Sequence, residues 1–97
     1  MVKAMRKAEI LEAAILCAQA VGYQWITLEQ VAAHCHVSKG TVVHHYGTMI
    51  ALKRAVLAEA VARNLPDLVA QGLADRNPIA LEAPEDVRQA ALASLGQ

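Results

Sequence analysis

Apolar residues recur every three or four positions along the start of the chain, which is the spacing of one face of an α-helix. This pattern predicts a first helix from about Lys3 to Val21. Gly22 follows directly and is suited to end the helix, because glycine readily takes the left-handed conformation found there. The apolar side of this helix is formed by Ile10, Leu11, Ala14, Cys17, Ala18 and Val21.

A short second helix is predicted over residues 27–34. Thr27 can cap its first free N–H groups, and Gln30, three residues later, can reach back to the backbone of Thr27. The residues of its buried side are Leu28, Val31 and Ala32. In the connector before it, we expect Tyr23 and Trp25 to cover the helical core, and ligand contact is the alternative for these aromatic residues.

Ser38 is a second N-cap candidate only eleven residues after Thr27, so three residues, Cys35, His36 and Val37, join the two helices. Such a short connection is typical of a helix-turn-helix, in which the second helix contacts DNA. We expect Val37 to point inward, and Val42 and Tyr46, four residues apart, to face the core. The residues that then face outward are Lys39, Gly40, Thr41, Val43 and His44, with His45 near the edge of that face.

The remainder of the chain also carries helical patterns separated by prolines. A fourth helix is predicted from near Thr48 to about Asn64, and Pro66 ends that stretch because it disfavours helix at the preceding residue. Further short helices start at Pro66, at Asn77-Pro78 and at Ala83-Pro84, and the last ends at Gly96. We therefore predict an all-α fold: a three-helix helix-turn-helix domain followed by a fourth helix and short C-terminal helices. The expected domains are a DNA-binding domain over residues 1–57 and a short helical extension over 58–97.

Composition narrows the class of protein. The chain has 97 residues, of which 56% are hydrophobic, and it contains no Phe, so the core must be built from small aliphatic side chains. No apolar stretch approaches the roughly 20 residues of a membrane span, and the N-terminus lacks a signal-peptide pattern. Cys17 on an apolar helix side and Cys35 in a turn do not form a disulfide framework. We expect a cytoplasmic protein that is stabilised by self-association.

Charge is distributed unevenly along the chain. Its formal net charge is zero, which by itself argues against contact with nucleic acid. Residues 1–54, however, hold six Lys and Arg against three Glu, a net charge of +3, and residues 55–97 have a net charge of −3. The basic half is the half that carries the helix-turn-helix, as DNA binding requires.

With these residues in place, the chain resembles the DNA-binding domain of the TetR family of bacterial repressors over about residues 6–57. The resemblance is carried by Ile10-Leu11, Ala13-Ala14, Gly22-Tyr23, Thr27, Val31-Ala32, Val37-Ser38-Lys39-Gly40-Thr41-Val42, His45-Tyr46 and Leu52. It implies that the helix from Ser38 to Tyr46 enters the major groove and that two subunits bind a palindrome. The residues that it places near bases or phosphates are Thr27, Lys39, Gly40, Thr41 and His45.

Three positions depart from the family pattern. His36 stands where a turn Gly is usual, Val43 where a Tyr often contacts phosphate, and Met49 where a Lys usually does. The additional His residues or an N-terminal arm of Lys3, Arg6 and Lys7 can supply the missing contacts. A solvated tail is the alternative for these three basic residues.

Family members normally continue into a domain that binds an inducer and forms the dimer, and residues 58–97 are too few to enclose such a pocket. We therefore predict a minimal repressor, suited to a plasmid or phage, with no cofactor and no small-molecule ligand. Its short C-terminal helices are expected to pair two subunits. The expected dimerisation residues are Leu65, Leu68, Val69, Leu73, Val87, Ala91 and Leu95.

The predicted mechanism is occupancy of an operator that overlaps a promoter. Thr41 and Val43 can touch thymine methyl groups, and His44 or Lys39 can contact guanine acceptors. The full set of expected DNA-binding residues is Thr27, Ser38, Lys39, Gly40, Thr41, Val43, His44, His45, Lys3, Arg6 and Lys7.

Two other functions remain open at this stage. A metal-responsive regulator would use His34, Cys35, His36, His44 and His45, although their spacings match no structural zinc pattern. A protein-binding module would use the helical surface instead. We do not expect an enzyme, because the chain has no Gly-rich phosphate loop, no Ser-His-acid set in a known context and no evident pair of catalytic carboxylates.

Overall fold

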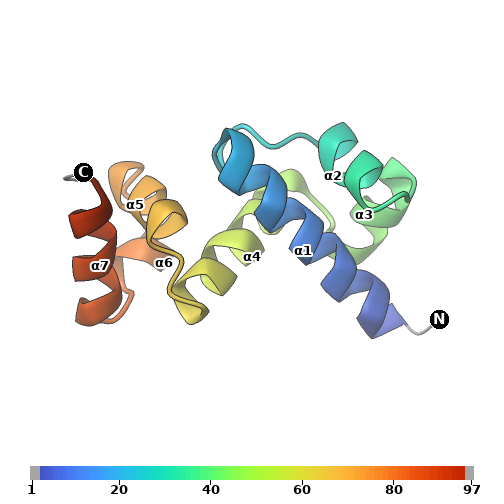
Figure 1. Cartoon of the computed structure of the whole chain (residues 1–97). Coiled ribbons are helices and arrows are strands. Elements are labelled where there is room, and N and C mark those ends of the chain that lie inside the picture. The colour runs from blue at the N-terminus through green and yellow to red at the C-terminus, as the bar shows by residue number, and fades with distance from the viewer. Residues whose placement is uncertain (1–2, 96–97) are drawn as a thin grey trace. The chain divides into compact units, whose positions relative to one another are not determined.

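The computed structural model describes residues 3–95, with side chains from Arg6 to Leu95. Within this range the chain forms seven α-helices and no β-strand, so the predicted all-α fold is confirmed. The helices are α1 (Lys3–Val21), α2 (Leu28–His34), α3 (Lys39–Tyr46), α4 (Met49–Ala62), α5 (Pro66–Ala74), α6 (Pro78–Leu81) and α7 (Glu85–Leu95) (Figure 1). The side chain of Lys3, and Gly96 as the end of the last helix, lie outside what the structure describes.

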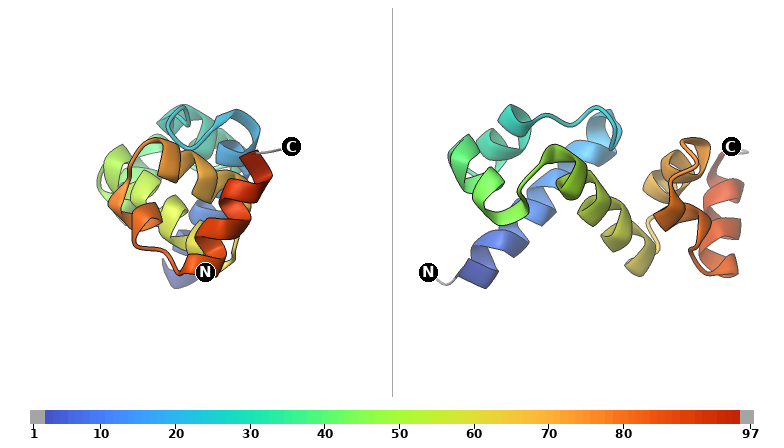
Figure 2. Two further views of the ribbon diagram at one scale, coloured as in Figure 1. Left: turned by 90° about the vertical axis from the view of Figure 1, so that its left-hand side faces the viewer. Right: turned by 180° about the vertical axis from the view of Figure 1, so that it is seen from behind.

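The chain divides into two compact units between Val56 and Leu57, which we call unit 1 (Met1–Val56) and unit 2 (Leu57–Gln97). In unit 1, α1 contacts both α2 and α3, and α2 contacts α3. In unit 2, α5 packs against α6 and α7, and Figures 1 and 2 both show α5 beside α7. Among the described residues, no helix has the length and apolar composition needed to cross a membrane.

The predicted end of α1 is confirmed at Gly22, whose φ of +98° lies in the left-handed region and whose N–H donates to the carbonyl of Ala18 at 2.7 Å. The buried residues of α1 are Ile10, Ala13, Ala14, Ile15 and Ala18. The prediction that Val21 lies inside was wrong, because the last three residues of α1, Gln19 to Val21, are exposed to solvent.

Both predicted helix starts of the helix-turn-helix are present. Thr27 Oγ1 accepts the N–H of Gln30 at 3.1 Å, and Gln30 Oε1 accepts the N–H of Thr27 at 3.1 Å, which completes a capping box. Ser38 Oγ accepts the N–H of Thr41 at 3.1 Å at the start of α3. These caps fix where α2 and α3 begin, and Val31, Ala32 and Val42 are buried between the helices of unit 1.

The turn between α2 and α3 places His36 at φ +57°, in the left-handed region that favours glycine. This explains why the family pattern has Gly there, and His36 accepts the conformation at some cost in backbone strain. The turn is closed by the N–H of Val37, which donates to the carbonyl of Ala32 at 3.0 Å. Val37 is half-buried, in keeping with its predicted inward direction.

The two aromatic residues of the connector differ in burial. Tyr23 is buried as predicted, but Trp25 is 72% exposed, so its expected role as a core residue was wrong. The N–H of Trp25 donates to the carbonyl of Gly22 at 3.0 Å, which closes a tight turn. Tyr23 and Ile26 on either side of the turn point into the core, while its tip, Gln24 and Trp25, points to solvent.

The helices after α3 start at the predicted residues. Thr48 Oγ1 accepts the N–H of Ala51 at 3.1 Å ahead of α4, which ends at Ala62, two residues before the predicted limit. Pro66 is the first residue of α5, and Asn77 Oδ1 accepts the N–H of Ile79 at 3.0 Å to cap α6. The first turn of α7 carries the expected acidic residues, Glu85 and Asp86.

Close helix packing in unit 2 depends on Gly72. A Cβ atom at this position would lie 2.8 Å from the Cβ of Ala80 and 2.8 Å from Cδ1 of Leu57. Because neither neighbour leaves room for a side chain, glycine is required where α5 meets α6 and the end of α4.

The dimerisation residues predicted in unit 2 require a correction. Leu68, Val69, Val87 and Ala91 are buried in the core that α5 and α7 form together, so they are not available to a second subunit. A unit this small has few apolar side chains and needs these for its own stability. Of the remaining predicted residues, Leu65 and Leu73 are half-buried and Leu95 is exposed.

Candidate DNA-binding interface

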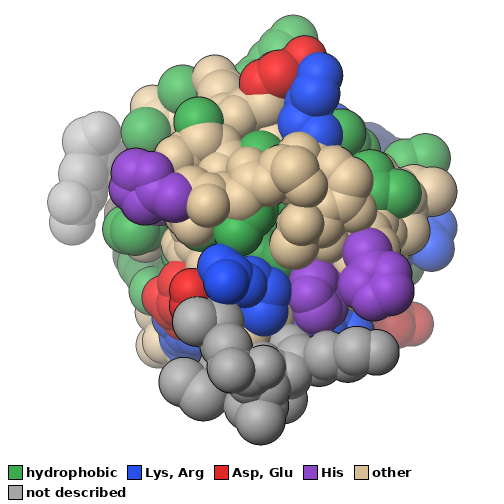
Figure 3. All heavy atoms as spheres, turned by 90° about the vertical axis from the view of Figure 1, so that its right-hand side faces the viewer, with side chains coloured by type: hydrophobic (Ala, Val, Ile, Leu, Met, Phe, Trp, Pro, Cys, Tyr) green, Lys and Arg blue, Asp and Glu red, His purple; other side chains and the backbone are tan. Residues whose placement is uncertain are grey.

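Helix α3 has one buried side and one side directed to solvent. Val42 is 1% exposed and anchors the helix to the core. On the opposite side, which we call the outward face, Lys39, Gly40, Val43 and His44 are exposed and Thr41 is half-buried. Figure 3, which views the side of unit 1 that carries α2 and α3, shows Lys, Arg and His side chains beside apolar ones there. The predicted outward-facing residues are therefore accessible to solvent, Thr41 less so than the others.

The first turn of α3 is held by a small hydroxyl network. Ser38 Oγ lies 2.9 Å from Thr41 Oγ1 while it also accepts the N–H of Thr41. Because the Thr41 hydroxyl is engaged at the helix start, Thr41 is held in a fixed position on the outward face. Thr27, the other predicted contact at a helix start, is exposed at the beginning of α2.

An ion pair connects α2 to α3. Glu29 Oε2 lies 3.9 Å from Lys39 Nζ, and both side chains are largely exposed. Lys39 was predicted to contact DNA, whereas Glu29 was not singled out from the sequence. The only signal in the sequence was the position of this acidic residue in the first turn of α2, two residues after Thr27.

The start of α1 lies against the end of α3. The hydroxyl of Tyr46 donates to the carbonyl of Lys7 at 3.1 Å, and Lys7 Nζ lies 5.1 Å from the centre of the Tyr46 ring. Lys7 is therefore held beside the C-terminal end of α3, where it adds positive charge. Arg6 pairs with Glu9 on α1 at 3.8 Å, so its charge is partly neutralised.

Two histidines follow one another near the end of α3. The rings of His44 and His45 meet edge to face with their centres 5.3 Å apart, and His45 is half-buried. His34 and His36 are exposed on α2 and in the turn. Across the described residues, no three His, Cys, Asp or Glu side chains are grouped so that they could hold a metal ion.

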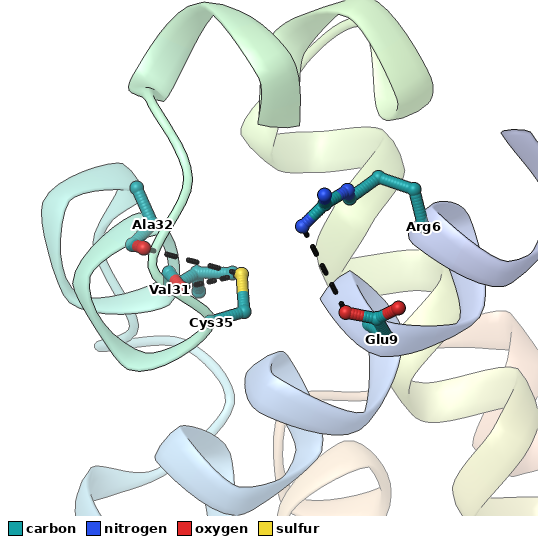
Figure 4. A network of polar contacts seen from close by, with 5 residues as sticks. All are labelled: Arg6, Glu9, Val31, Ala32 and Cys35. Carbon is teal, nitrogen blue, oxygen red and sulfur yellow. Dashed lines mark hydrogen bonds and ion pairs between the residues drawn. The ribbon is translucent and has the colours of Figure 1, made fainter. Parts of the chain in front are cut away.

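Cys17 and Cys35 are free, partly buried thiols of unit 1. The thiol of Cys35 donates to the carbonyl of Val31 at 3.2 Å, and Figure 4 shows it between α2 and the paired Arg6 and Glu9. Burial raises the pKa of Cys35, while hydrogen bonding to its backbone and Arg6 lower it and Glu9 raises it. Burial and the nearby Cys35 thiol raise the pKa of Cys17. Both thiols therefore favour the protonated, unreactive form.

Comparison with known proteins yields one match. The family model for bacterial regulatory proteins of the tetR family matches residues 10–56, from α1 to the middle of α4. No curated protein and no solved structure gives a significant match to the chain.

Proposed function

Because the chain carries, at residues 10–56, the DNA-binding domain of the tetR family of bacterial regulatory proteins, we propose that this transcription regulator is a repressor that binds a palindromic operator as a homodimer. The outward face of α3 is the observation that carries the proposal. Its exposed side chains project from a helix whose opposite side is locked into the core by Val42. A rigid helix of this kind can enter the major groove without rearrangement.

The base contacts in this proposal come from the outward face. Thr41 and Val43 meet thymine methyl groups, and His44 donates to guanine acceptors. Lys39, at the first position of α3, donates to a phosphate. Gly40 allows close approach of the backbone, because it has no side chain on the exposed first turn of α3.

Phosphate contacts fix the orientation of α3 in the groove. Ser38 and Thr27 at the helix starts, His45, and the basic residues of α1 provide them in this proposal. The contact of Lys7 with Tyr46 supports this role, because it holds a cation beside the end of α3, which the proposed docking brings close to the duplex backbone. Arg6 precedes Lys7 directly, and Lys3 lies one turn before Lys7 on α1. In this proposal, the three basic residues form an arm that contacts successive phosphates.

Pairing of two subunits places two α3 helices in successive major grooves, about 34 Å apart on one side of the duplex. When the operator overlaps a promoter, the bound dimer blocks access of RNA polymerase without any further interaction. We propose that unit 2 supplies the pairing surface through exposed Leu81, Leu92 and Leu95, in place of the residues it buries in its own core. We also propose that the protein has no pocket for a small-molecule inducer that would relieve repression.

Selection of bound fragments from a pool of random double-stranded DNA tests the proposal directly. The expected result is an enriched palindrome whose half-sites are about one helical turn apart. Retention of fragments without any common sequence, or no retention at low salt, would contradict sequence-specific binding.

A further inference from the structure

The ion pair between Glu29 and Lys39 lies within the candidate DNA-binding interface. Glu29 lies two residues after Thr27 in the first turn of α2, and Lys39 follows Ser38 at the first position of α3. The side chain of Glu29 is 71% exposed and that of Lys39 is 59% exposed. An ion pair with this exposure adds little to folding stability, because water already solvates both charges well.

The same pair has a larger consequence for DNA binding. A phosphate that approaches Lys39 must compete with the carboxylate of Glu29 for the ammonium group. Residues 1–54 have a net charge of only +3 and contain just three acidic residues, Glu9, Glu12 and Glu29. Glu9 is paired with Arg6 on α1, whereas Glu29 is directed at a residue of the outward face.

We propose that Glu29 is a positioning residue that holds Lys39 away from DNA phosphates and so weakens sequence-independent binding. This inference rests on the proposed function. Weaker sequence-independent binding is an advantage for a repressor, because the protein must dissociate from a large excess of non-operator sites before it finds its operator. A glutamate beside the DNA contacts provides this weakening. Base contacts on the outward face then decide where the protein stays.

Replacing Glu29 with Gln keeps the size and the hydrogen-bonding capacity of the side chain and removes its charge. The E29Q variant is expected to bind DNA about two- to fivefold more tightly at about 50 mM salt, by the strength of an exposed pair. Lys39 then gains one phosphate contact, so the slope of log K against log salt becomes steeper by about 0.9. The gain is the same on the selected operator and on a shuffled duplex, because phosphate contact carries no sequence information.

Two control variants test whether the effect passes through Lys39. Glu59→Gln removes the same charge from α4 in unit 2, where Glu59 pairs with Arg63, and is expected to leave DNA binding unchanged. In a K39Q background, the E29Q substitution is expected to give no further gain. Thermal unfolding of each variant is expected to match the parent protein, so that a change in binding is not a change in folding.

Fluorescence anisotropy titrations of both duplexes at several salt concentrations provide the measurement. An unchanged affinity for E29Q, a gain on one duplex only, an equal gain for E59Q, or a full gain in the K39Q background would each overturn the role of Glu29. If the parent protein binds neither duplex, the proposed function fails and this inference fails with it. Binding by the parent protein with no effect of E29Q refutes the inference alone.

Discussion

His44 is the exposed residue of the outward face best suited to donate to a base. Replacing it with Ala is expected to cost about 1–3 kcal/mol of binding free energy and to relax preference at one base position of the operator. Gel-shift titrations against operators that differ at single positions measure this directly. His34→Ala is the matched control, because His34 is also exposed but lies at the end of α2. Equal losses for both variants would show that α3 does not read the base in this way.

The raised pKa values of Cys17 and Cys35 predict slow thiol chemistry in the folded protein. Because the pKa values of the thiols are higher in the folded protein, the folded state favours the protonated thiols. Their contribution to the free energy of unfolding is fully present below the pKa of the unfolded thiols, and it is lost as pH rises through the higher pKa of the folded state. Alkylation by iodoacetamide at neutral pH is expected to be much slower in the folded protein than in urea, with its pH profile displaced upward. Alkylation at the same rate in both states would contradict the burial of these thiols.

At the scale of a helix, the start of α3 combines a folding role with a binding role at Ser38. Asn and Asp both cap helices about as well as Ser, so S38N and S38D are expected to unfold within about 0.5 kcal/mol of the parent protein, whereas S38A loses about 1 kcal/mol. The Asn and Asp side chains differ mainly by one negative charge. S38D is therefore expected to bind DNA more weakly than S38N, with a difference that shrinks as salt increases. Urea unfolding and anisotropy titration separate the two effects, and equal DNA affinities would place the start of α3 away from phosphate.

Helix α4 provides a test of the core beneath the interface. Leu52 is fully buried whereas Ile50, half a turn earlier, is 66% exposed. Leu52→Ala is expected to lower the free energy of unfolding by about 2–5 kcal/mol, because it removes buried methyl groups and leaves a cavity. Ile50→Ala is expected to change it by less than about 0.5 kcal/mol. Chemical denaturation measures both, and comparable losses would mean that the side of α4 facing the core has been wrongly assigned.

Helix starts and ends were predictable from sequence, because local groups determine them. Thr27, Ser38 and Asn77 offer oxygens to free N–H groups, and Pro66 excludes helix before it. Burial was less predictable, because it depends on which residues another helix covers. The apolar spacing of α1 included Val21, which is exposed although Ala18, one turn earlier, is buried. The connector turned Trp25 outward by a backbone hydrogen bond to Gly22.

The same distinction applies to the candidate site. The outward face followed from the periodicity of α3 once Val42 was assigned to the core. The contacts of Lys7 with Tyr46 and of Glu29 with Lys39 join different helices, so no local pattern could reveal them. The four predicted dimerisation residues that proved buried show the same limit, because an apolar face indicates burial without identifying what covers it.

At the scale of the whole molecule, DNA binding and pairing are assigned to different units, so each can be perturbed separately. Unit 2 fills its core with the apolar residues shared by α5 and α7, yet it leaves Leu92 52% exposed on α7. Leu92→Glu is expected to shift the protein from dimer to monomer in sedimentation velocity, because it would bury a charge in the paired surface. A monomer binds DNA with one α3 helix, whereas the dimer binds with two. The affinity for the complete palindrome is therefore expected to fall sharply, while the affinity for a single half-site is unchanged.

Ala93→Glu adds the same charge to α7 at the next residue, which is also exposed but lies about 100° around the helix from Leu92, and it serves as the control. It is expected to leave both sedimentation and operator binding unchanged. Because Leu92 is exposed, Leu92→Glu is expected to leave the protein folded, since surface substitutions usually change stability by less than about 0.5 kcal/mol. A Leu92→Glu protein that still sediments as a dimer would assign pairing to another surface. A parent protein that is monomeric and yet binds its palindrome tightly would show that the operator itself brings the two subunits together.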